Sequence, residues 1–217
     1  MSRSRAAIAE IVREYGPFSG VDNVHGVTFD GRNVWFAAGD TLKALDPTSG
    51  KLVRSIEVAA DAGSAFDGRH LFQIAADRIQ KIDPKTGRLL ATIPAPGGGG
   101  DSGLAWAEGT LWVGHYRERK IHQVDPQTGK ILRTINSNRF VTGVTWVDGE
   151  LWHGTWEDEK SEVCRIDPAT GEVLEQLAMP PGVGVSGLES DGGERFFCGG
   201  GTSGKVRTVK RPMRKAG

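Results

Sequence analysis

The sequence has few cysteines and no long apolar run, and each absence excludes a class of protein. Two of the 217 residues are cysteine, Cys164 and Cys198, and they fall in expected strands of different repeats. We expect two buried free thiols, because a disulfide framework needs more paired cysteines than this. No apolar run approaches the roughly 20 residues that span a bilayer, and the N-terminus lacks the apolar core of a secretion signal. The sequence therefore predicts a cytoplasmic chain without a membrane-spanning segment.

The chain also lacks an excess of charge of either sign. Lysine plus arginine and aspartate plus glutamate both total 27. A protein whose main partner is nucleic acid or an anionic membrane usually carries a surplus of basic residues. We therefore expect neither of these partners, and we expect the chain to be a monomer.

What the sequence does contain is a repeated unit, which is clearest at residues 103–135. This unit holds four short runs rich in Val, Ile, Leu, Trp and Thr, separated by turn residues. Such a pattern is typical of an antiparallel four-stranded meander. The first two runs meet at Glu108-Gly109, which suits a tight hairpin, and the last two meet at Asp125-Pro126 with Gly129 returning the chain. One such sheet cannot bury both of its faces, so it needs neighbours.

The repeat has five copies. The glycine of the first run recurs at intervals of 37 to 44 residues, as Gly26, Gly63, Gly103, Gly143 and Gly187. A period near 40 with four strands in each period is typical of a β-propeller blade. We predict an all-β, five-bladed β-propeller of four-stranded antiparallel blades. It forms a single domain over residues 1–217, with blades near 23–59, 60–96, 97–138, 139–182 and 183–211.

The fifth copy is incomplete, because no turn and no fourth run follow residues 205–209. Residues 11–15, upstream of the first blade, match the pattern of the fourth run at residues 131–135. We predict that the N-terminal strand completes the last blade, so that pairing of the chain ends closes the ring and leaves no sheet edge open.

Aromatic residues recur at two positions of the repeat. They are Phe29, Phe66, Trp106 and Trp146 in the first run, and Trp35, Phe72, Trp112, Trp152 and Phe196 in the second. Bulky residues at one blade position fill the wedge between neighbouring blades, so we interpret them as core rather than as a cofactor box. The repeated glycines are interpreted as close contacts around the axis.

Function is expected where the copies differ. In a meander, the second-to-third loops and the links between blades share one face of the ring. That face carries nearly all of the length variation, including insertions at residues 115–120 and 155–162. Insertions on one face of a repeat array usually mark its binding face. The candidate residues there are His25, Asp101, Ser102, His115, Tyr116, Arg117, Arg139, Thr142, Trp156, Glu157 and Ser186.

Two other interpretations of local patterns are weaker. His25, His115 and His153 would form a metal site if they converged, but no ligand spacing requires it, so no metal ligand is assigned. Residues 199–205 have the glycine and lysine spacing of a phosphate-binding loop. Val206, however, stands where Ser or Thr would hold magnesium, and a strand is expected next, so this interpretation is rejected. No motif identifies a cofactor.

The blade texture, as in residues 111–135 and 150–174, resembles the plant-type and bacterial glutamine cyclotransferases, which are five-bladed propellers that close N-terminal glutamine to pyroglutamate. More distantly, it is similar to the streptogramin lyases, which use histidine and glutamate around magnesium. The Thr155-Trp156 pair resembles a Leu-Thr-Trp segment of the cyclotransferases, which implies that Trp156 is a wall of the substrate pocket.

The cyclotransferases also carry an acid just after the second-strand aromatic. The equivalent residues here are Phe36, Gln73, Val113, His153 and Phe197, and none is acidic.

These patterns lead to a functional hypothesis with an alternative. We predict a pocket for a small molecule or a peptide N-terminus, with His25, Tyr116, Arg117, Arg139 and Trp156 binding the substrate. As an enzyme, the chain would be a cyclotransferase or lyase with Glu157 or Asp101 as acid/base and His115 as their partner. The alternative is a propeller without catalysis that holds a ligand or a protein on the same face.

Overall fold

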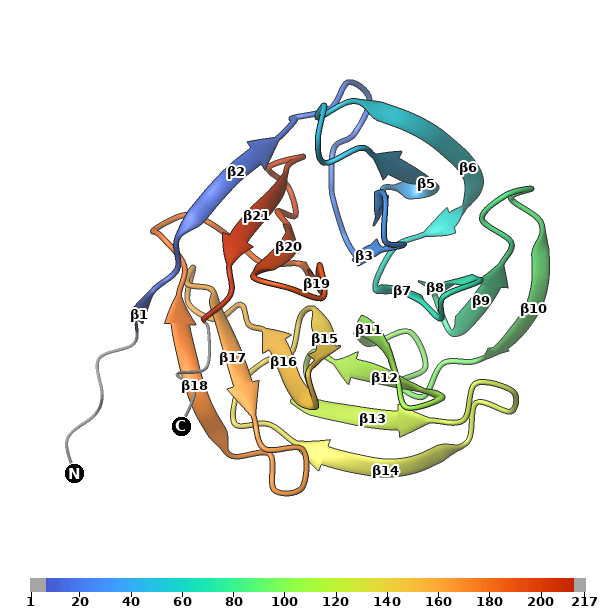
Figure 1. The fold of residues 1–217 in the computed structure, drawn as a ribbon. Coiled ribbons are helices and arrows are strands. Elements are labelled where there is room, and N and C mark those ends of the chain that lie inside the picture. The colour runs from blue at the N-terminus through green and yellow to red at the C-terminus, as the bar shows by residue number, and fades with distance from the viewer. Residues whose placement is uncertain (1–6, 213–217) are drawn as a thin grey trace, which may run out of the picture.

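The chain forms a closed ring of five β-sheets, as predicted. The computed structural model describes residues 7–212 and places the sheets around a central axis (Figure 1). Blade 1 contains β3 (Val27–Phe29), β4 (Val34–Ala37), β5 (Gly39–Leu45) and β6 (Leu52–Ala60). Blade 2 contains β7 (Ser64–Phe66), β8 (Leu71–Ala75), β9 (Arg78–Ile82) and β10 (Leu89–Pro94). Blade 3 contains β11 (Asp101–Ala107), β12 (Thr110–His115), β13 (Lys120–Val124) and β14 (Ile131–Asn136).

The last two blades complete the ring. Blade 4 contains β15 (Val144–Val147), β16 (Glu150–Gly154), β17 (Glu162–Ile166) and β18 (Val173–Ala178). Blade 5 contains β19 (Gly187–Ser190), β20 (Arg195–Gly199), β21 (Val206–Lys210) and the N-terminal β2 (Ile11–Tyr15). Within residues 7–212, no helix is long and apolar enough to cross a membrane.

The N-terminal strand closes the ring. β2 pairs antiparallel with β21, with Tyr15 opposite Val206, and the two strands lie side by side in Figure 1. The Tyr15 hydroxyl donates a hydrogen bond of 2.9 Å to the Pro47 carbonyl of blade 1, so this strand also ties blade 5 to its neighbour. One strand was not predicted: β1 (Ala7–Ile8) pairs in parallel with β18 and adds a fifth strand to blade 4.

The repeated glycines are required where the innermost strands meet. A Cβ atom at Gly26, Gly63, Gly103, Gly143 or Gly187 would lie less than 3.0 Å from backbone atoms of the next blade. Neighbouring blades therefore approach at van der Waals distance around the axis, which only a residue without a side chain permits.

The recurrent aromatic residues pack between blades, as expected for core. The rings of Phe72 and Trp106 stack at 5.5 Å, and those of Trp112 and Trp146 stack at 5.0 Å. Trp112 is fully buried. Each pair joins the second strand of one blade to the first strand of the next, so the aromatic layer holds adjacent sheets together.

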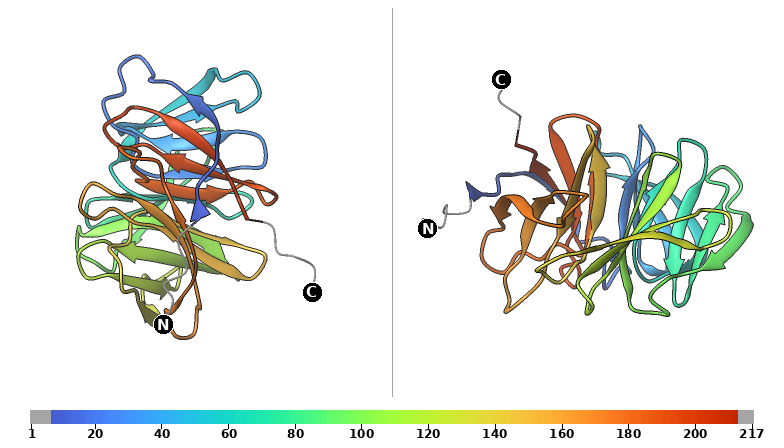
Figure 2. Two further views of the ribbon diagram at one scale, coloured as in Figure 1. Left: turned by 90° about the vertical axis from the view of Figure 1, so that its left-hand side faces the viewer. Right: turned by 90° about the horizontal axis from the view of Figure 1, so that it is seen from below.

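The two faces of the ring have different loops, and Figure 2 shows the ring from two sides. The lower face, defined here as the face of the first-to-second and third-to-fourth turns, carries uniform Asp-Pro turns. In one of them the Asp125 carboxylate accepts the N–H groups of Thr128 and Gln127, and these hydrogen bonds lower the pKa of Asp125. The upper face, defined here as the face of the second-to-third loops and interblade links, carries the loops that vary in length.

Cys164 and Cys198 are buried and free, and burial raises the pKa of each thiol to about 12.

Candidate functional site

The upper face is hollowed next to the axis. A cavity of about 580 Å³, called the aromatic cavity here, is lined by Tyr116, Thr142, Trp156, Gly182, Gly184, Val185, Ser186, Gly200, Gly201, Thr202 and Ser203. A cavity of about 220 Å³, the axial cavity, is lined by His25, Asp61, Ala62, Asp101, Ser102, Thr142 and Ser186. The two cavities share Thr142 and Ser186, so they are adjacent parts of one hollow. A further cavity of about 420 Å³, the charged cavity, is lined by Arg139, Thr155, Glu157, Asp158, Lys160 and Glu162.

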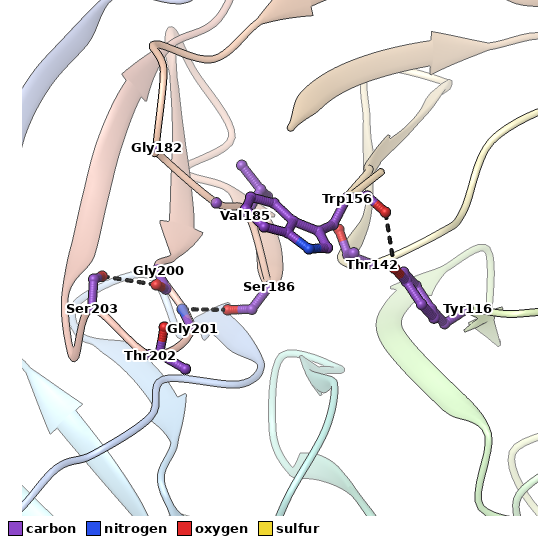
Figure 3. Close-up of a pocket in the computed structure, with 11 residues that line it drawn as sticks. Tyr116, Thr142, Trp156, Gly182, Val185, Ser186, Gly200, Gly201, Thr202 and Ser203 are labelled. Atoms are coloured by element: carbon purple, nitrogen blue, oxygen red, sulfur yellow. Dashed lines mark hydrogen bonds between the residues drawn. The ribbon is translucent and has the colours of Figure 1, made fainter. Parts of the chain in front are cut away.

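Trp156 forms the flat wall of the aromatic cavity (Figure 3). The residue is 36% exposed, although it is one of the largest apolar side chains of the chain. A Cβ atom added at Gly184 would lie 3.4 Å from the indole, so the ring packs against that glycine. The Tyr116 hydroxyl donates a 2.9 Å hydrogen bond to the Trp156 carbonyl. The Gly184 contact therefore supports the indole and the Tyr116 bond holds the backbone of Trp156, while part of the ring surface remains open.

The loops that carry Tyr116 and Trp156 are joined by stacked side chains. The ring of Tyr116 stacks on that of Phe140, with 5.0 Å between their centroids. The Arg119 guanidinium also lies over the Phe140 ring, 4.2 Å from its centroid. Arg119 in turn pairs with Glu157 at 3.0 Å. Because blades 3 and 4 and the link between them all contribute, this cluster holds the insertions of both blades in one arrangement.

The Glu157 carboxylate faces the charged cavity rather than the aromatic one. Its partner is Arg119, and Arg139 of the same cavity lies 3.6 Å from Glu162. Arg117 is exposed and lines none of these cavities. The predicted substrate-binding arginines, Arg117 and Arg139, therefore do not line the aromatic cavity.

Asp101 lies in the axial cavity at the start of β11. It is 8% exposed, and both of its carboxylate oxygens accept the N–H of Gly97, at 3.0 and 2.9 Å. Burial raises the pKa of Asp101, although the Gly97 hydrogen bond and the nearby His115 oppose the shift. Asp101 is thus a buried carboxyl at the edge of a cavity, with a pKa above its ordinary value.

His115 lies opposite Asp101 in the β11–β12 register but lines none of the cavities. Its Nδ1 accepts the N–H of Glu118 at 3.2 Å, so a neutral ring carries its proton on Nε2. A Cβ atom at Gly97 would lie 2.6 Å from Asp101 Oδ1 and 2.8 Å from His115 Nε2, so Gly97 separates the two groups without filling the space.

His25 lines the axial cavity from the other side. It is half-buried, and desolvation lowers the pKa of its imidazole, while the charge of Asp61 opposes that shift. None of the hydrogen bonds among the described residues involves the His25 ring, so a neutral ring offers one donor and one acceptor.

The third histidine of the sequence analysis has a structural role. His153 is fully buried between the Ser137 hydroxyl and the Gly154 carbonyl, and burial lowers its pKa to about 4. No group of three or more His, Cys, Asp or Glu residues in the described part of the chain is placed to hold a metal ion. Residues 200–205, which follow the end of β20 at Gly199, form the turn to β21, without a helix.

Two hydroxyl side chains beside the repeated glycines, Ser102 and Ser186, also have structural partners. Ser102 donates to the Val141 carbonyl at 2.7 Å, and Ser186 donates to the Val24 carbonyl at 2.5 Å. Each bond joins the start of one blade to the link before the next. Ser102 and Ser186 therefore shape the floor of the hollow by tying blades together.

Sequence reasoning missed Glu189. In the first strands, this position is occupied by Thr or Ala in the other blades, namely Thr28, Ala65, Ala105 and Thr145. Its carboxylate accepts hydrogen bonds from Thr28 at 2.8 Å and Thr145 at 2.6 Å, from the neighbouring blades on both sides. The residue as a whole is half-buried, and desolvation of its carboxyl group raises the pKa to about 7. Aligning the repeats would have shown one acid among small residues.

The fold and the hollow define a class, the five-bladed propellers with a ligand-sized cavity on one face of the ring. Residues 75–211 match the family described as outer membrane protein assembly factor BamB, and the chain belongs to this family. No curated protein sequence matches the chain at a significant level.

Among solved structures, glutaminyl cyclase from Myxococcus xanthus is similar with a TM-score of 0.78 and 19% identity, covering 94% of this chain and 96% of that one. Virginiamycin B lyase from Staphylococcus aureus matches with a TM-score of 0.54 and 15% identity, over 92% of this chain and 70% of that one. Hydrazine synthase from Kuenenia stuttgartiensis matches with a TM-score of 0.52 and 19% identity, over 91% of this chain and 60% of that one. The resemblance to cyclotransferases and streptogramin lyases is confirmed at the level of the fold.

Proposed function

We propose that the chain binds a small molecule or a peptide N-terminus in the aromatic cavity, with a flat part of the ligand against Trp156. The observation that carries this proposal is an indole that packs against Gly184, on a backbone that the Tyr116 hydrogen bond holds, with part of its surface open to a cavity of about 580 Å³. A mostly apolar cavity with a few polar groups is typical of a small-ligand site. An open, preorganised aromatic wall also lowers the entropy cost of binding.

Replacing Trp156 tests this proposal. We expect Trp156→Ala to weaken binding of the dipeptide amide Gln-Phe-NH₂ by about tenfold or more, because stacking area is lost. The free energy of unfolding should change by only about 1 kcal/mol, since the side chain is partly exposed. Isothermal titration calorimetry and urea denaturation measure the two quantities.

A matched control is Leu132→Ala, which removes an exposed apolar side chain from the outer strand β14. It should leave the affinity unchanged. Equal affinities of the wild type and Trp156→Ala would remove Trp156 from the binding site.

A second candidate function is cyclisation of an N-terminal glutamine. Asp101 favours it, because this buried carboxyl with a raised pKa lines the axial cavity, next to the aromatic one. In such a reaction the terminal amine attacks the side-chain amide carbon and ammonia leaves. Asp101 would accept a proton from the amine and deliver it to the departing nitrogen. Glu157, which pairs with Arg119 in the charged cavity, is less suited to this transfer.

The two acids can be separated by substitution. We expect Asp101→Asn to lower the rate of ammonia release from Gln-Phe-NH₂ by about a hundredfold or more, which is the usual contribution of a general acid/base. Glu157→Gln should keep most of the rate. A coupled ammonia assay measures both. Loss of the rate in Glu157→Gln alone would assign the acid/base role to Glu157, and no ammonia from the wild type would leave binding as the function.

A further inference from the structure

The charged side chains that line the aromatic and axial cavities are of one sign. None of the residues that line either cavity is Lys or Arg. The axial cavity instead contains two carboxyl groups: Asp61, from the link before blade 2, and Asp101, from the start of β11 in blade 3. Low-dielectric walls strengthen the potential of fixed charges inside a cleft. The hollow therefore attracts cations and repels anions.

The two carboxyl groups differ in depth. Asp101 is buried, while Asp61 is exposed at the rim. Each is oriented by a backbone N–H: Asp101 by that of Gly97, and Asp61 by that of Ala76, whose nitrogen lies 3.2 Å from both oxygens. Each carboxylate has further acceptor capacity, because a carboxylate has about four lone-pair sites.

The third titratable group of the axial cavity is the imidazole of His25. None of the hydrogen bonds among the described residues involves this ring. A neutral imidazole adds a hydrogen-bond acceptor without adding positive charge. An alkylammonium group has three donors, and the two carboxylates and the imidazole together supply three acceptors.

We propose that the preferred ligand is a small organic cation, with a primary ammonium in the axial cavity between Asp61 and Asp101 and a flat apolar arm against Trp156. This inference rests on the proposed function for the position of the arm. The position of the ammonium depends only on the acidic groups of the axial cavity. The shared residues Thr142 and Ser186 mark the boundary at which the two parts of the ligand join.

Three ligands of similar shape and different charge test the inference: 2-phenylethylamine, 2-phenylethanol and 3-phenylpropionate. We expect the amine to bind about tenfold or more tightly than the alcohol, and the carboxylate to bind more weakly than either. The preference for the amine should decrease as salt is added, because the rim carboxylate is exposed to screening. Calorimetric titration at two salt concentrations gives all three affinities.

Substitution of the carboxyl groups is the second part of the experiment. Asp101→Asn and Asp61→Asn should each reduce the affinity for the amine severalfold toward that for the alcohol, and should leave the alcohol unaffected. Asp61 is exposed, so its variant is expected to fold even if Asp101→Asn does not. Asp40→Asn, an exposed aspartate at the start of β5 that lines neither cavity, is the matched control and should change nothing.

The outcomes separate this inference from the proposed function. If the amine and the alcohol bind equally and both are lost in Trp156→Ala, the aromatic site stands and the cation preference is overturned. If the amine keeps its advantage in the double variant Asp61→Asn, Asp101→Asn, the ammonium does not lie in the axial cavity and the inference is wrong. If none of the three ligands binds, the cation inference is overturned, while the titration with Gln-Phe-NH₂ decides the proposed function separately.

Discussion

Deletion of residues 1–15 is expected to leave the chain largely unfolded at 25 °C. The deletion removes β2, and with it the buried Tyr15 and Ala9 and the hydrogen bonds that β2 makes with β21. It also removes the link to blade 1, because the Tyr15 hydroxyl bonds the Pro47 carbonyl. Burial of one large side chain contributes about 1.5 to 3 kcal/mol. With the strand pairing, we expect a loss of about 5 kcal/mol, close to the whole stability of many domains.

Circular dichroism and urea denaturation measure this effect. Deletion of residues 1–6 alone is the control, because it keeps β1 and β2. We expect the shorter deletion to resemble the wild type, and the longer one to aggregate as well, since it exposes an unpaired edge of β21. Equal stability of the two deletions would show that β2 is not needed to close the ring.

The second large effect is expected at Glu189, whose ionisation should destabilise the protein. Burial raises the pKa of this group from its ordinary value near 4.5 to about 7. Below pH 4.5, Glu189 is protonated in both the folded and the unfolded state, and the neutral carboxyl makes its full contribution to the free energy of unfolding. As the pH rises through about 7, the folded state must ionise a group surrounded by protein, and the contribution is lost. The loss amounts to about 2 to 3 kcal/mol.

Glu189→Gln isolates this contribution. Glutamine is neutral at all pH values and keeps a carbonyl that can accept from Thr28 or Thr145. We expect the variant and the wild type to have similar stability at pH 4.5, and the variant to be about 2 to 3 kcal/mol more stable at pH 8. Urea denaturation across this range gives the difference. A constant difference between pH 4.5 and 8 would mean that Glu189 is ionised at its ordinary pKa.

The comparison with the variant is needed because His153 has the opposite dependence. Burial lowers the pKa of this imidazole to about 4, so its contribution is complete above its ordinary value near 6.5 and is lost as the pH falls toward 4. Between pH 4.5 and 6.5, the fall in the free energy of unfolding that Glu189 causes and the rise that His153 causes therefore offset each other in the wild type. In Glu189→Gln, the stability should rise with pH through this window.

Most of the fold could be predicted because its determinants are local and repeated. The Asp125 turn bonds its own backbone, Gly103 meets the next blade, and residues 11–15 carry the pattern of a fourth strand. Each of these features recurs or has a counterpart in another copy, so one interpretation is checked several times. β1 was missed because its two residues pair with a strand of another blade and carry no repeat pattern.

The site could be predicted only in part, because a shared face does not determine which cavity a side chain lines. Tyr116 and Trp156 meet through a hydrogen bond between insertions of two blades, whereas Glu157, one residue along the chain, turns to Arg119 and another cavity. His115 was expected beside a substrate, but its Nδ1 accepts a backbone N–H and its ring faces Gly97. The direction of each of these side chains depends on the backbone geometry of its turn, for example the positive φ of Arg119. Composition does not reveal this geometry.

The central claim, that the upper-face hollow next to Trp156 is the binding site, is tested most directly by nuclear magnetic resonance. The chain has six tryptophans, and Trp156→Phe identifies the indole N–H signal of Trp156. Titration with Gln-Phe-NH₂ is predicted to shift this signal and the backbone amides of Gly184 and residues 200–203, while the lower-face turns such as Gly129 stay unchanged. Shifts that gather on the lower face, or saturable binding that leaves the Trp156 signal in place, would contradict the account.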